Sequence, residues 1–190
     1  MNGSQLIVRA GGHGRSVAEA VLLGGAYELG GFVDDGWEQA PEVWGYTVFG
    51  GTNSLEAFRY RAETAIVAIG NNSVRELLHM RLPRCGFGIA TIIYPKAIVS
   101  SSARLGAGAT VMAGAITGTE AQFGEGVIVT SGATVDHDCT VEDFGHLGVN
   151  ACMAGGSILG RGAWLQAGSA LGYGVRVPPA DLLKPGDGRG

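Results

Sequence analysis

Residues 133–156, ATVDHDCTVEDFGHLGVNACMAGG, repeat a pattern with a period of six. Bulky apolar residues recur at every sixth position, at Val135, Val141, Leu147 and Met153. A small residue stands two positions before each of them, at Ala133, Cys139, Gly145 and Ala151. Two residue classes held in a fixed phase indicate a repeated structural unit rather than an ordinary loop.

The same phase extends in both directions, from Val99 to Val177. Thirteen of the fourteen bulky positions are apolar, Thr117 being the exception, and all thirteen intervening positions are small or β-branched. The chain contains 34 glycines in 190 residues, far above the average usage of about 7%. A glycine-rich linker would not keep this phase, so we expect a parallel β-helix in which three units close a triangular coil.

The regular pattern weakens after Val177. Pro178 and Pro179 follow, and Asp181 stands where a small residue belongs. We therefore expect the β-helix to occupy residues 96–183 and residues 184–190 to form a loosely ordered tail.

Residues 1–95 predict a different, α/β architecture. Short apolar stretches at 5–8, 30–33, 64–67 and 89–93 are typical of strands, and helical patterns lie at 17–25 and 73–86. Strands that alternate with helices predict a small Rossmann-like parallel sheet, which binds ligands at the carboxyl ends of its strands.

Glycines and polar residues gather at these predicted strand ends. They are Gly12, His13, Gly14, Asp34, Asp35, Gly70, Asn71 and Asn72, and we expect them to form one crevice that binds substrate. Glycines let a phosphate approach backbone amides at a helix N-terminus. The dinucleotide fingerprint is imperfect, however, because its first glycine is replaced by Arg9. A bound nucleotide and a merely tight turn both remain open, and redox use of NAD is disfavoured because no second domain brings a substrate to it.

Charge and composition limit the partners of the chain. The net charge is −4 and no block of like charges occurs, which argues against nucleic acid and anionic membranes. No apolar run approaches the ~20 residues of a membrane span, and a secretory signal peptide is not evident. Cys85, Cys139 and Cys152 form no CxxC pair and are expected to be reduced thiols in a cytoplasmic protein.

Three titratable residues, Asp136, His137 and Asp138, interrupt the hexapeptide pattern. A histidine can act as a general base near neutral pH, and a carboxylate can fix its tautomer and stabilise its cation. A solvated surface turn would explain the same residues.

Five stretches occur in a characteristic order: AGGHG (10–14), FVDD (32–35), AIGNN (68–72), VDHDC (135–139) and GHLGVNACMAGG (145–156). From Leu6 to about Val177, the chain resembles the sugar acyltransferases of the sialic acid O-acetyltransferase and bacillosamine N-acetyltransferase type. The resemblance implies a left-handed β-helix, a homotrimer, acetyl-CoA between neighbouring β-helices and a nucleotide-linked sugar on the N-terminal domain.

The resemblance also implies roles for individual residues. His137 matches the general base and Asp138 the acid beside it. His146 matches a histidine near the acyl donor, while a packing role would also explain it. Gly155, Gly156 and Gly160 match positions along the donor's amide-rich arm, although turns would equally account for glycine there.

Two features depart from the family pattern. Thr130 stands where the amine-transferring members usually carry an asparagine, and we expect it to border the acceptor. The chain is also short at its C-terminus, where relatives generally add a further coil.

The sequence thus predicts an acetyl-CoA-dependent acetyltransferase that acts on the amino group of a nucleotide-linked sugar. Sugar O-acetylation and a catalytically silent nucleotide-sugar-binding trimer remain the alternatives. A zinc enzyme would need three histidines around one metal, whereas the predicted β-helix offers only His137 and His146, so no metal is expected.

Overall fold

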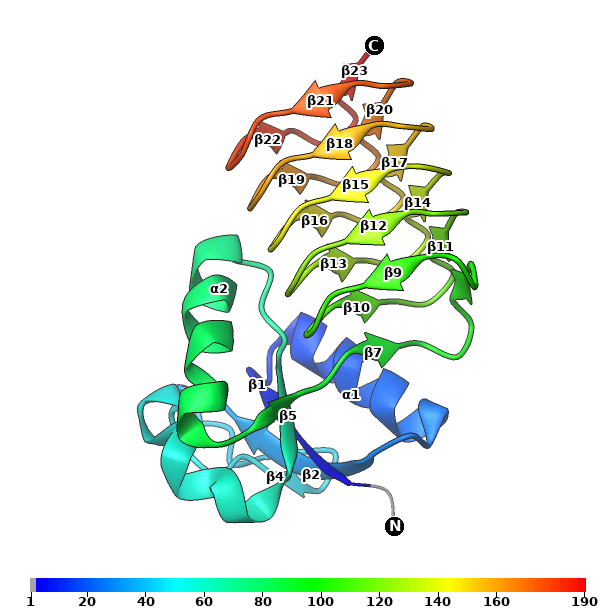
Figure 1. Ribbon diagram of the computed structural model, residues 1–190. Coiled ribbons are helices and arrows are strands. Elements are labelled where there is room, and N and C mark those ends of the chain that lie inside the picture. The colour runs from blue at the N-terminus through cyan, green and yellow to red at the C-terminus, as the bar shows by residue number, and fades with distance from the viewer. Residues whose placement is uncertain (1–2) are drawn as a thin grey trace. The chain divides into compact units, whose positions relative to one another are not determined.

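The chain folds into two compact units in the computed structural model (Figure 1). The units divide between Ile92 and Ile93. The structure describes residues 3–190. The first unit is a parallel α/β sheet and the second is a parallel β-helix, so the predicted fold class is confirmed.

Between residues 3 and 91, the N-terminal unit forms six strands, two α-helices and two 3-10 segments. Its elements are β1 (Ser4–Val8), α1 (Gly12–Gly24), β2 (Glu28–Val33), β3 (Glu42–Val43), β4 (Tyr46–Thr47), η1 (Thr52–Arg61), β5 (Thr64–Val67), α2 (Asn72–Arg81), η2 (Pro83–Cys85) and β6 (Gly88–Ile89). The main sheet has the order β2-β1-β5-β6, and its strands pair in parallel. The carboxyl ends of β1, β2 and β5 therefore lie along one edge, where the glycine-rich and acidic motifs follow.

The boundaries differ from the sequence-based expectation in two places. Helix α1 begins at Gly12 rather than near Val17, because the glycine-rich motif itself forms the first helical turn. The single strand expected at 89–93 is two strands. Strand β6 pairs with β5, whereas β7 (Ile92–Ile93) belongs to a sheet of the β-helix.

Three flat sheets form the walls of the β-helix, and we name each after one of its strands. The β16 sheet holds β7, β10 (Thr110–Val111), β13 (Ile128–Val129), β16 (His146–Leu147), β19 (Trp164–Leu165) and β22 (Leu182–Leu183). The β14 sheet holds β8 (Ile98–Val99), β11 (Ile116–Thr117), β14 (Thr134–Val135), β17 (Cys152–Met153), β20 (Ala170–Leu171) and β23 (Gly188–Arg189). The β15 sheet holds β9 (Arg104–Leu105), β12 (Gln122–Phe123), β15 (Thr140–Val141), β18 (Ile158–Leu159) and β21 (Arg176–Val177).

Residues 18 apart pair between neighbouring coils, as Val135 does with Met153 and Val141 with Leu159. The bulky residue of each hexapeptide points inward and stacks on its copies, and the small residues fill the corners of the same core. Glycine often follows the bulky residue because the next coil leaves no room there. A Cβ atom on Gly118 would lie 2.7 Å from the backbone of Asp136.

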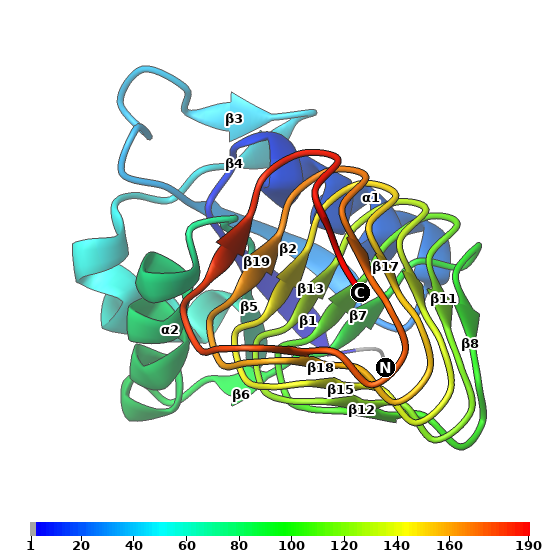
Figure 2. The ribbon, with the colours of Figure 1, turned by 90° about the horizontal axis from the view of Figure 1, so that it is seen from above.

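The coil is left-handed. Figure 2 looks down the β-helix from its C-terminal end, and the chain passes clockwise from β17 through β18 to β19 as it rises toward the viewer. This sense is opposite to the usual right-handed crossover between parallel strands.

The turns of the β-helix share one backbone feature that explains much of the glycine content. From residue 108 to residue 186, every sixth residue has a positive φ, between 54° and 76°. Nine of these fourteen positions are glycine, the residue that adopts this conformation at no steric cost. Asp138 occupies one of the other five.

The β-helix continues past residue 183, which differs from the loose tail expected at 184–190. Strands β22 and β23 pair with β19 and β20, and Leu183 is buried at the bulky position. Asp181 replaces the small residue without disrupting the coil, because its carboxylate lies toward solvent and pairs with Arg189 at 2.8 Å.

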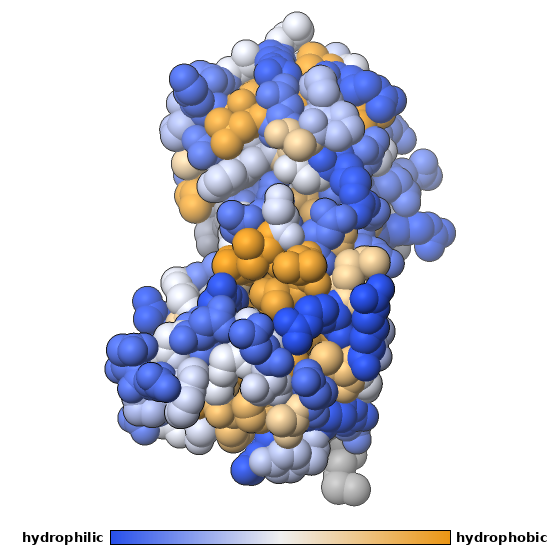
Figure 3. All heavy atoms as spheres, turned by 90° about the vertical axis from the view of Figure 1, so that its left-hand side faces the viewer, coloured by the Kyte–Doolittle hydropathy of each residue, from blue (hydrophilic) through white to orange (hydrophobic). Residues whose placement is uncertain are grey.

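Hydrophobic side chains on the upper coils lie in separate patches among hydrophilic ones on the face in Figure 3.

Candidate active site

The DHD motif lies on the turn between β14 and β15, at a corner of the β-helix. Backbone hydrogen bonds hold this turn from both sides. The amide of Asp138 donates to the carbonyl of Thr119 in the preceding coil, and the amide of Gly156 in the following coil donates to the carbonyl of His137. Asp138 has a φ of 57°, a conformation that aspartate tolerates better than most residues. The coil therefore fixes the backbone from which both side chains project.

The two side chains form a close pair. His137 Nδ1 lies 2.7 Å from Asp138 Oδ2, and His137 Nε2 lies 3.8 Å from Asp136 Oδ2. The hydrogen bond to Asp138 and the nearby charge of Asp136 raise the pKa of His137 above 6.5. In the neutral imidazole this pair places the proton on Nδ1 and leaves the Nε2 lone pair free, the tautomer a general base requires.

Gly155 lies directly against the imidazole ring of His137. A Cβ atom on Gly155 would be 2.5 Å from His137 Nε2 and 2.6 Å from Cε1. These separations are below any ordinary contact, so a side chain at position 155 would displace the ring. Gly156 is different, since a Cβ atom there would meet nothing within 4 Å. The Nε2 edge of His137 is therefore packed against Gly155, and open space is found beside Gly156.

His146 lies on β16, in a different sheet from the strands that flank His137. Its ring stacks on that of Trp164, with a centroid separation of 4.8 Å and an angle of 6°. His146 is 6% exposed. Trp164 did not emerge from the sequence analysis, although its position 18 residues after His146 in the same column was available as a signal.

Two further residues expected at the site have structural contacts. The hydroxyl of Thr130 donates to the carbonyl of Leu147 at 2.9 Å, so its proton is already engaged. A Cβ atom on Gly160 would lie 2.6 Å from the nitrogen of Pro179, so close packing of the next coil explains this glycine.

The N-terminal unit contains a crevice of about 270 Å³ at the strand ends. Gly12, His13, Asp34 and Gly70 line it together with Arg9, Gly11, Ala68 and Ile69. Four of the eight residues expected there are therefore brought together. The amides at the beginning of α1 border the crevice, and its N-cap residue, Gly11, has no capping side chain.

The other four expected residues shape the surroundings of the crevice. Gly14 gives α1 room to pack on β1, because a Cβ atom there would lie 2.0 Å from the carbonyl oxygen of Arg9. The side chain of Asn71 caps α2 by accepting from Val74 N. Asn72 Oδ1 accepts a hydrogen bond from Arg75 at 2.8 Å.

Asp35 is the fourth of these residues, and it anchors a neighbouring segment. Its Oδ1 accepts hydrogen bonds from the amide and the hydroxyl of Thr52, both at 2.8 Å. Burial alone would raise the pKa of Asp35, but these hydrogen bonds and the charge of Arg9 outweigh it and hold the pKa below its usual value.

Two arginines that the sequence analysis did not assign to the site influence the crevice. Burial, together with the charge of Arg75, lowers the pKa of His13 to about 4, so His13 is neutral at pH 7. Arg75 is itself buried and donates to the carbonyl of Ile69 at 2.9 Å. Arg9 pairs with Asp35 at 2.8 Å.

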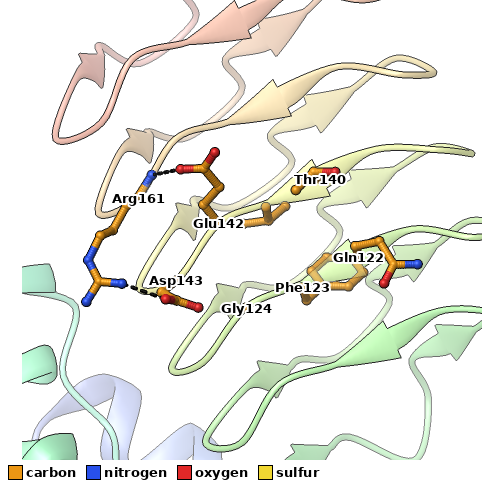
Figure 4. A pocket seen from close by; sticks show the side chains of 8 residues that line it. Gln122, Phe123, Gly124, Thr140, Glu142, Asp143 and Arg161 are labelled. Carbon is orange, nitrogen blue, oxygen red and sulfur yellow. Dashed lines mark hydrogen bonds and ion pairs between the residues drawn. The ribbon is translucent and has the colours of Figure 1, made fainter.

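A second cavity, of about 390 Å³, lies on the β15 sheet (Figure 4). Its charged groups are paired with one another across successive coils. The amide of Arg161 donates to Glu142 Oε2 at 2.9 Å, and the Arg161 guanidinium forms an ion pair with Asp143. Asp143 also accepts from the amide of Glu125. These contacts tie three coils together at a corner, which assigns them a structural role.

Within residues 3–190, no group of three histidine, cysteine, aspartate or glutamate side chains is arranged to hold a metal ion. No helix in the same range combines the length and apolar character needed to cross a membrane.

Comparison with known proteins agrees with this architecture. A family model for the PglD N-terminal domain matches residues 6–82. The acetyltransferase domain of PglB from Neisseria gonorrhoeae FA1090, solved in complex with acetyl coenzyme A, is 31% identical with a TM-score of 0.82, and the match covers 96% of each chain. The chain belongs to the hexapeptide-repeat sugar acyltransferases.

Two other members of this acyltransferase family bear on the candidate site. PerB from Caulobacter crescentus, solved in complex with CoA and GDP-perosamine, is 31% identical with a TM-score of 0.85, and the match covers 100% of this chain and 93% of PerB. The UDP-N-acetylbacillosamine N-acetyltransferase of Bacillus subtilis (strain 168) is 34% identical over 111 residues. That alignment spans 56% of this chain and half the length, 50%, of the curated relative.

Proposed function

We propose that this protein is an acetyl-CoA-dependent acetyltransferase that acts on the amino group of a nucleotide-linked amino-deoxy sugar. The observation that carries the proposal is the His137–Asp138 pair, in which a 2.7 Å hydrogen bond engages Nδ1 and leaves Nε2 as the basic nitrogen, with the ring packed against Gly155. The pair stands on a fold shared with the acetyltransferase domain of PglB, solved with acetyl coenzyme A, and with PerB, solved with CoA and GDP-perosamine. The UDP-N-acetylbacillosamine N-acetyltransferase of Bacillus subtilis is a further relative.

In the proposed reaction His137 is the general base. Its Nε2 removes a proton from the sugar amine as the nitrogen forms a bond to the acetyl carbon. Acetyl-CoA supplies that carbon as a thioester, whose C–S bond breaks. His137 then returns the proton to the departing sulfur, so the imidazole ends neutral and the products are an amide and a thiol. Asp138 stabilises the imidazolium between the two transfers.

We propose that the extended arm of acetyl-CoA passes beside Gly156, where a Cβ atom would meet nothing within 4 Å, and that Gly155 makes room for the imidazole of His137. We propose that His146 borders the same substrate from a neighbouring chain. Gly160 is not needed for this role, since coil packing accounts for it.

We assign the nucleotide part of the acceptor to the N-terminal crevice. Gly12, His13, Asp34 and Gly70 line a space of about 270 Å³ at the beginning of α1, where amides and the helix dipole favour a phosphate. Asp35, Asn71 and Asn72 would then act mainly by holding the crevice in shape, through their contacts with Thr52, Val74 and Arg75.

We further propose a homotrimer with β-helices side by side. His137 is 54% exposed in the single chain, too open to exclude water from an acyl transfer. The turn that carries it borders the β14 sheet, whose outer face presents Ile98 and Ile116, 64% and 39% exposed. A second copy against this face would bury the isoleucines and enclose His137. Light scattering at micromolar concentration tests the trimer, and a monomer there would contradict it.

Thr130 bears on whether the acceptor group is an amine or a hydroxyl. Its hydroxyl proton is engaged by Leu147, but its oxygen can still accept a hydrogen bond from a water that contacts the sugar. We therefore expect the amine to remain the acceptor. The alternative is sugar O-acetylation, which a preference for hydroxyl sugars would support.

The proposed function is tested by measuring CoA release with matched pairs of nucleotide sugars, one bearing an amino group and one a hydroxyl at the same carbon. We expect release with the amino sugar and little with its partner. Release with the hydroxyl sugar alone would replace the N-acetyl assignment by O-acetylation. Tight binding of the nucleotide sugar without any release would indicate a silent binding protein.

A further inference from the structure

Arg9 adopts an unusual backbone conformation at the end of β1. Its φ is 91°, in a region that side-chain-bearing residues rarely occupy and that favours glycine. It stands at the position where the dinucleotide fingerprint places its first glycine. A large cationic residue thus occupies a backbone position suited to the smallest residue.

The surrounding structure leaves this conformation no freedom to relax. The amide of Arg9 donates to the carbonyl of Val33 at 2.7 Å. Gly14 packs on the carbonyl of Arg9 so closely that a Cβ atom there would overlap it. The next amide, that of Ala10, donates to Asp34 Oδ2 at 2.9 Å. Strain that neighbouring contacts enforce in this way is often found at ligand-binding positions.

The side chain of Arg9 is fixed at one end and unsatisfied at the other. Its Nη1 lies 2.8 Å from Asp35 Oδ2 and 4.0 Å from Asp34 Oδ2. Its Nε, by contrast, is buried and has no hydrogen-bond partner within residues 3–190. An unpaired buried N–H of a charged group is costly, so a missing acceptor is indicated.

A second unsatisfied nitrogen lines the same crevice. The Nε2 of His13 is also buried and lacks a hydrogen-bond partner in the described part of the chain. Both residues line the crevice beside the first turn of α1, a helix of 13 residues with no acidic residue in that turn. The residues that carry these two nitrogens therefore line one small space together with the beginning of α1.

We propose that Arg9 is a specificity-determining residue that binds a phosphate of the nucleoside diphosphate through Nε, while its Nη1 holds Asp35. Without this cation, the carboxylate of Asp34, which lines the crevice, and the nearby carboxylate of Asp35 would repel the phosphate. Arg9 thereby makes an acidic strand end compatible with an anionic ligand. The inference rests on the proposed acceptor site, but it assigns a role to a residue that the glycine fingerprint does not contain.

Isothermal titration calorimetry with the full chain tests this role. The probes are UDP and GDP, the nucleosides uridine and guanosine, and inorganic pyrophosphate. The variants are Arg9→Gly, which also relieves the backbone conformation, and Arg9→Asn, which removes the cation but tolerates a positive φ. Arg84→Ala removes an exposed arginine outside the crevice and controls for net charge.

We expect both Arg9 variants to bind the preferred diphosphate on the order of 10- to 100-fold more weakly, as for a lost hydrogen bond to a charged group. Their affinity for the matching nucleoside should remain within about twofold of the wild-type value. Unchanged diphosphate affinity, or an equal loss for the nucleoside, would overturn the proposal. A wild-type protein that binds none of the probes overturns both this role and the acceptor site, whereas diphosphate binding without acetyl transfer overturns only the proposed function.

Discussion

The N-terminal crevice and the β-helix corner that carries His137 differ in how their charged side chains are held and in how far solvent reaches them. In the crevice, the side chains of Arg9 and Asp34 are each 24% exposed, and Asp35 beside it is 49% exposed; contacts with backbone amides and with one another hold these side chains. At the corner, His137 and Asp138 form a close pair but stand largely in solvent, with side chains 54% and 61% exposed. All the residues that line the crevice belong to one chain. At the corner, His137 and Asp138 are close together, but no part of residues 3–190 encloses them against solvent. Binding of the acceptor should therefore be separable from chemistry.

The largest expected effect comes from His137→Ala. Loss of this proposed general base should lower kcat by roughly 10²–10⁴, measured as CoA release at saturating substrates. Affinity for the nucleoside diphosphate should not change, because the crevice lies in the other compact unit. Retention of near wild-type turnover would assign the base to another residue, with His146 the next candidate.

Gly155→Ala should displace the His137 ring without touching its chemistry. A misplacement of about 1 Å can cost on the order of 10²-fold in rate, so we expect a fall in kcat of that size. Gly168→Ala is the control, since Gly168 has a φ of 68° and a Cβ atom there would meet nothing within 4 Å. It should lose stability but keep its rate. Equal rate losses in the two variants would mean that a general disturbance of the coil, rather than displacement of the ring, is responsible.

Gly12→Val tests the proposed acceptor site in the N-terminal crevice. A Cβ atom on Gly12 meets nothing within 4 Å, so the variant should fold, yet its side chain would extend the first turn of α1 toward the crevice. We expect the KM for the acceptor to rise about tenfold or more through blocked phosphate approach, with the KM for acetyl-CoA unchanged. Ser16→Val, one turn further along α1 and outside the crevice lining, is the matched control. Equal changes in both KM values would remove the acceptor from the crevice.

A pH profile tests the His137–Asp138 pair more finely. The base must be neutral, so kcat/KM should rise with pH through the pKa of His137, which the hydrogen bond to Asp138 and the charge of Asp136 raise above 6.5. Asp138→Asn removes the larger cause and keeps a residue that tolerates a positive φ. The acidic limb should therefore move to lower pH. Asp136→Asn should move it less, since Asp136 is 3.8 Å from the ring. An unmoved limb in Asp138→Asn would mean that another group controls it.

The smallest effect concerns stability. Thr117 is the one polar residue in the bulky column, and its buried hydroxyl has no partner within residues 3–190. It stacks between Val99 and Val135. Thr117→Val should stabilise the fold by about 1 kcal/mol, or roughly 2–4 °C in Tm by calorimetry. Thr134→Val, on the outer face of the same sheet, should give no gain. A lower Tm for Thr117→Val would show that the hydroxyl has a favourable role.

The sequence predicted the β-helix well because its period is local and repeated. Each coil needs a bulky apolar residue at the same positions, so thirteen matching positions together make a strong signal from a preference that is weak at any one position. The position of His137 on a turn follows from the same register. The order of the last coil could not be predicted, because Asp181 and the two adjacent prolines look incompatible with a coil when its strand partners are unknown. The coil accommodates them because it pairs with the preceding coil on one side and faces solvent on the other.

The N-terminal site was less predictable, for a different reason. Asn71, Asn72 and Asp35 carry the residue types of a ligand site, yet each is engaged in a local contact that shapes the loop around it. Composition cannot separate these uses. The conformation of Arg9 was also hidden, since a positive φ at a non-glycine residue is set by tertiary contacts with Val33 and Gly14.

From residue 108 to residue 186, one residue in every six has a left-handed backbone conformation, and this restricts which amino acids can stand there. At each such position the backbone is one that a mirror-image amino acid would adopt with ease, and glycine is the only genetically encoded residue without a hand. Asp138 departs from glycine, and its side chain binds His137. Replacing Gly168 with D-alanine by chemical synthesis should leave the coil intact and restrict the unfolded chain. The same exchange at position 138 would keep the turn and remove the carboxylate, separating what the backbone needs from what the proposed chemistry needs.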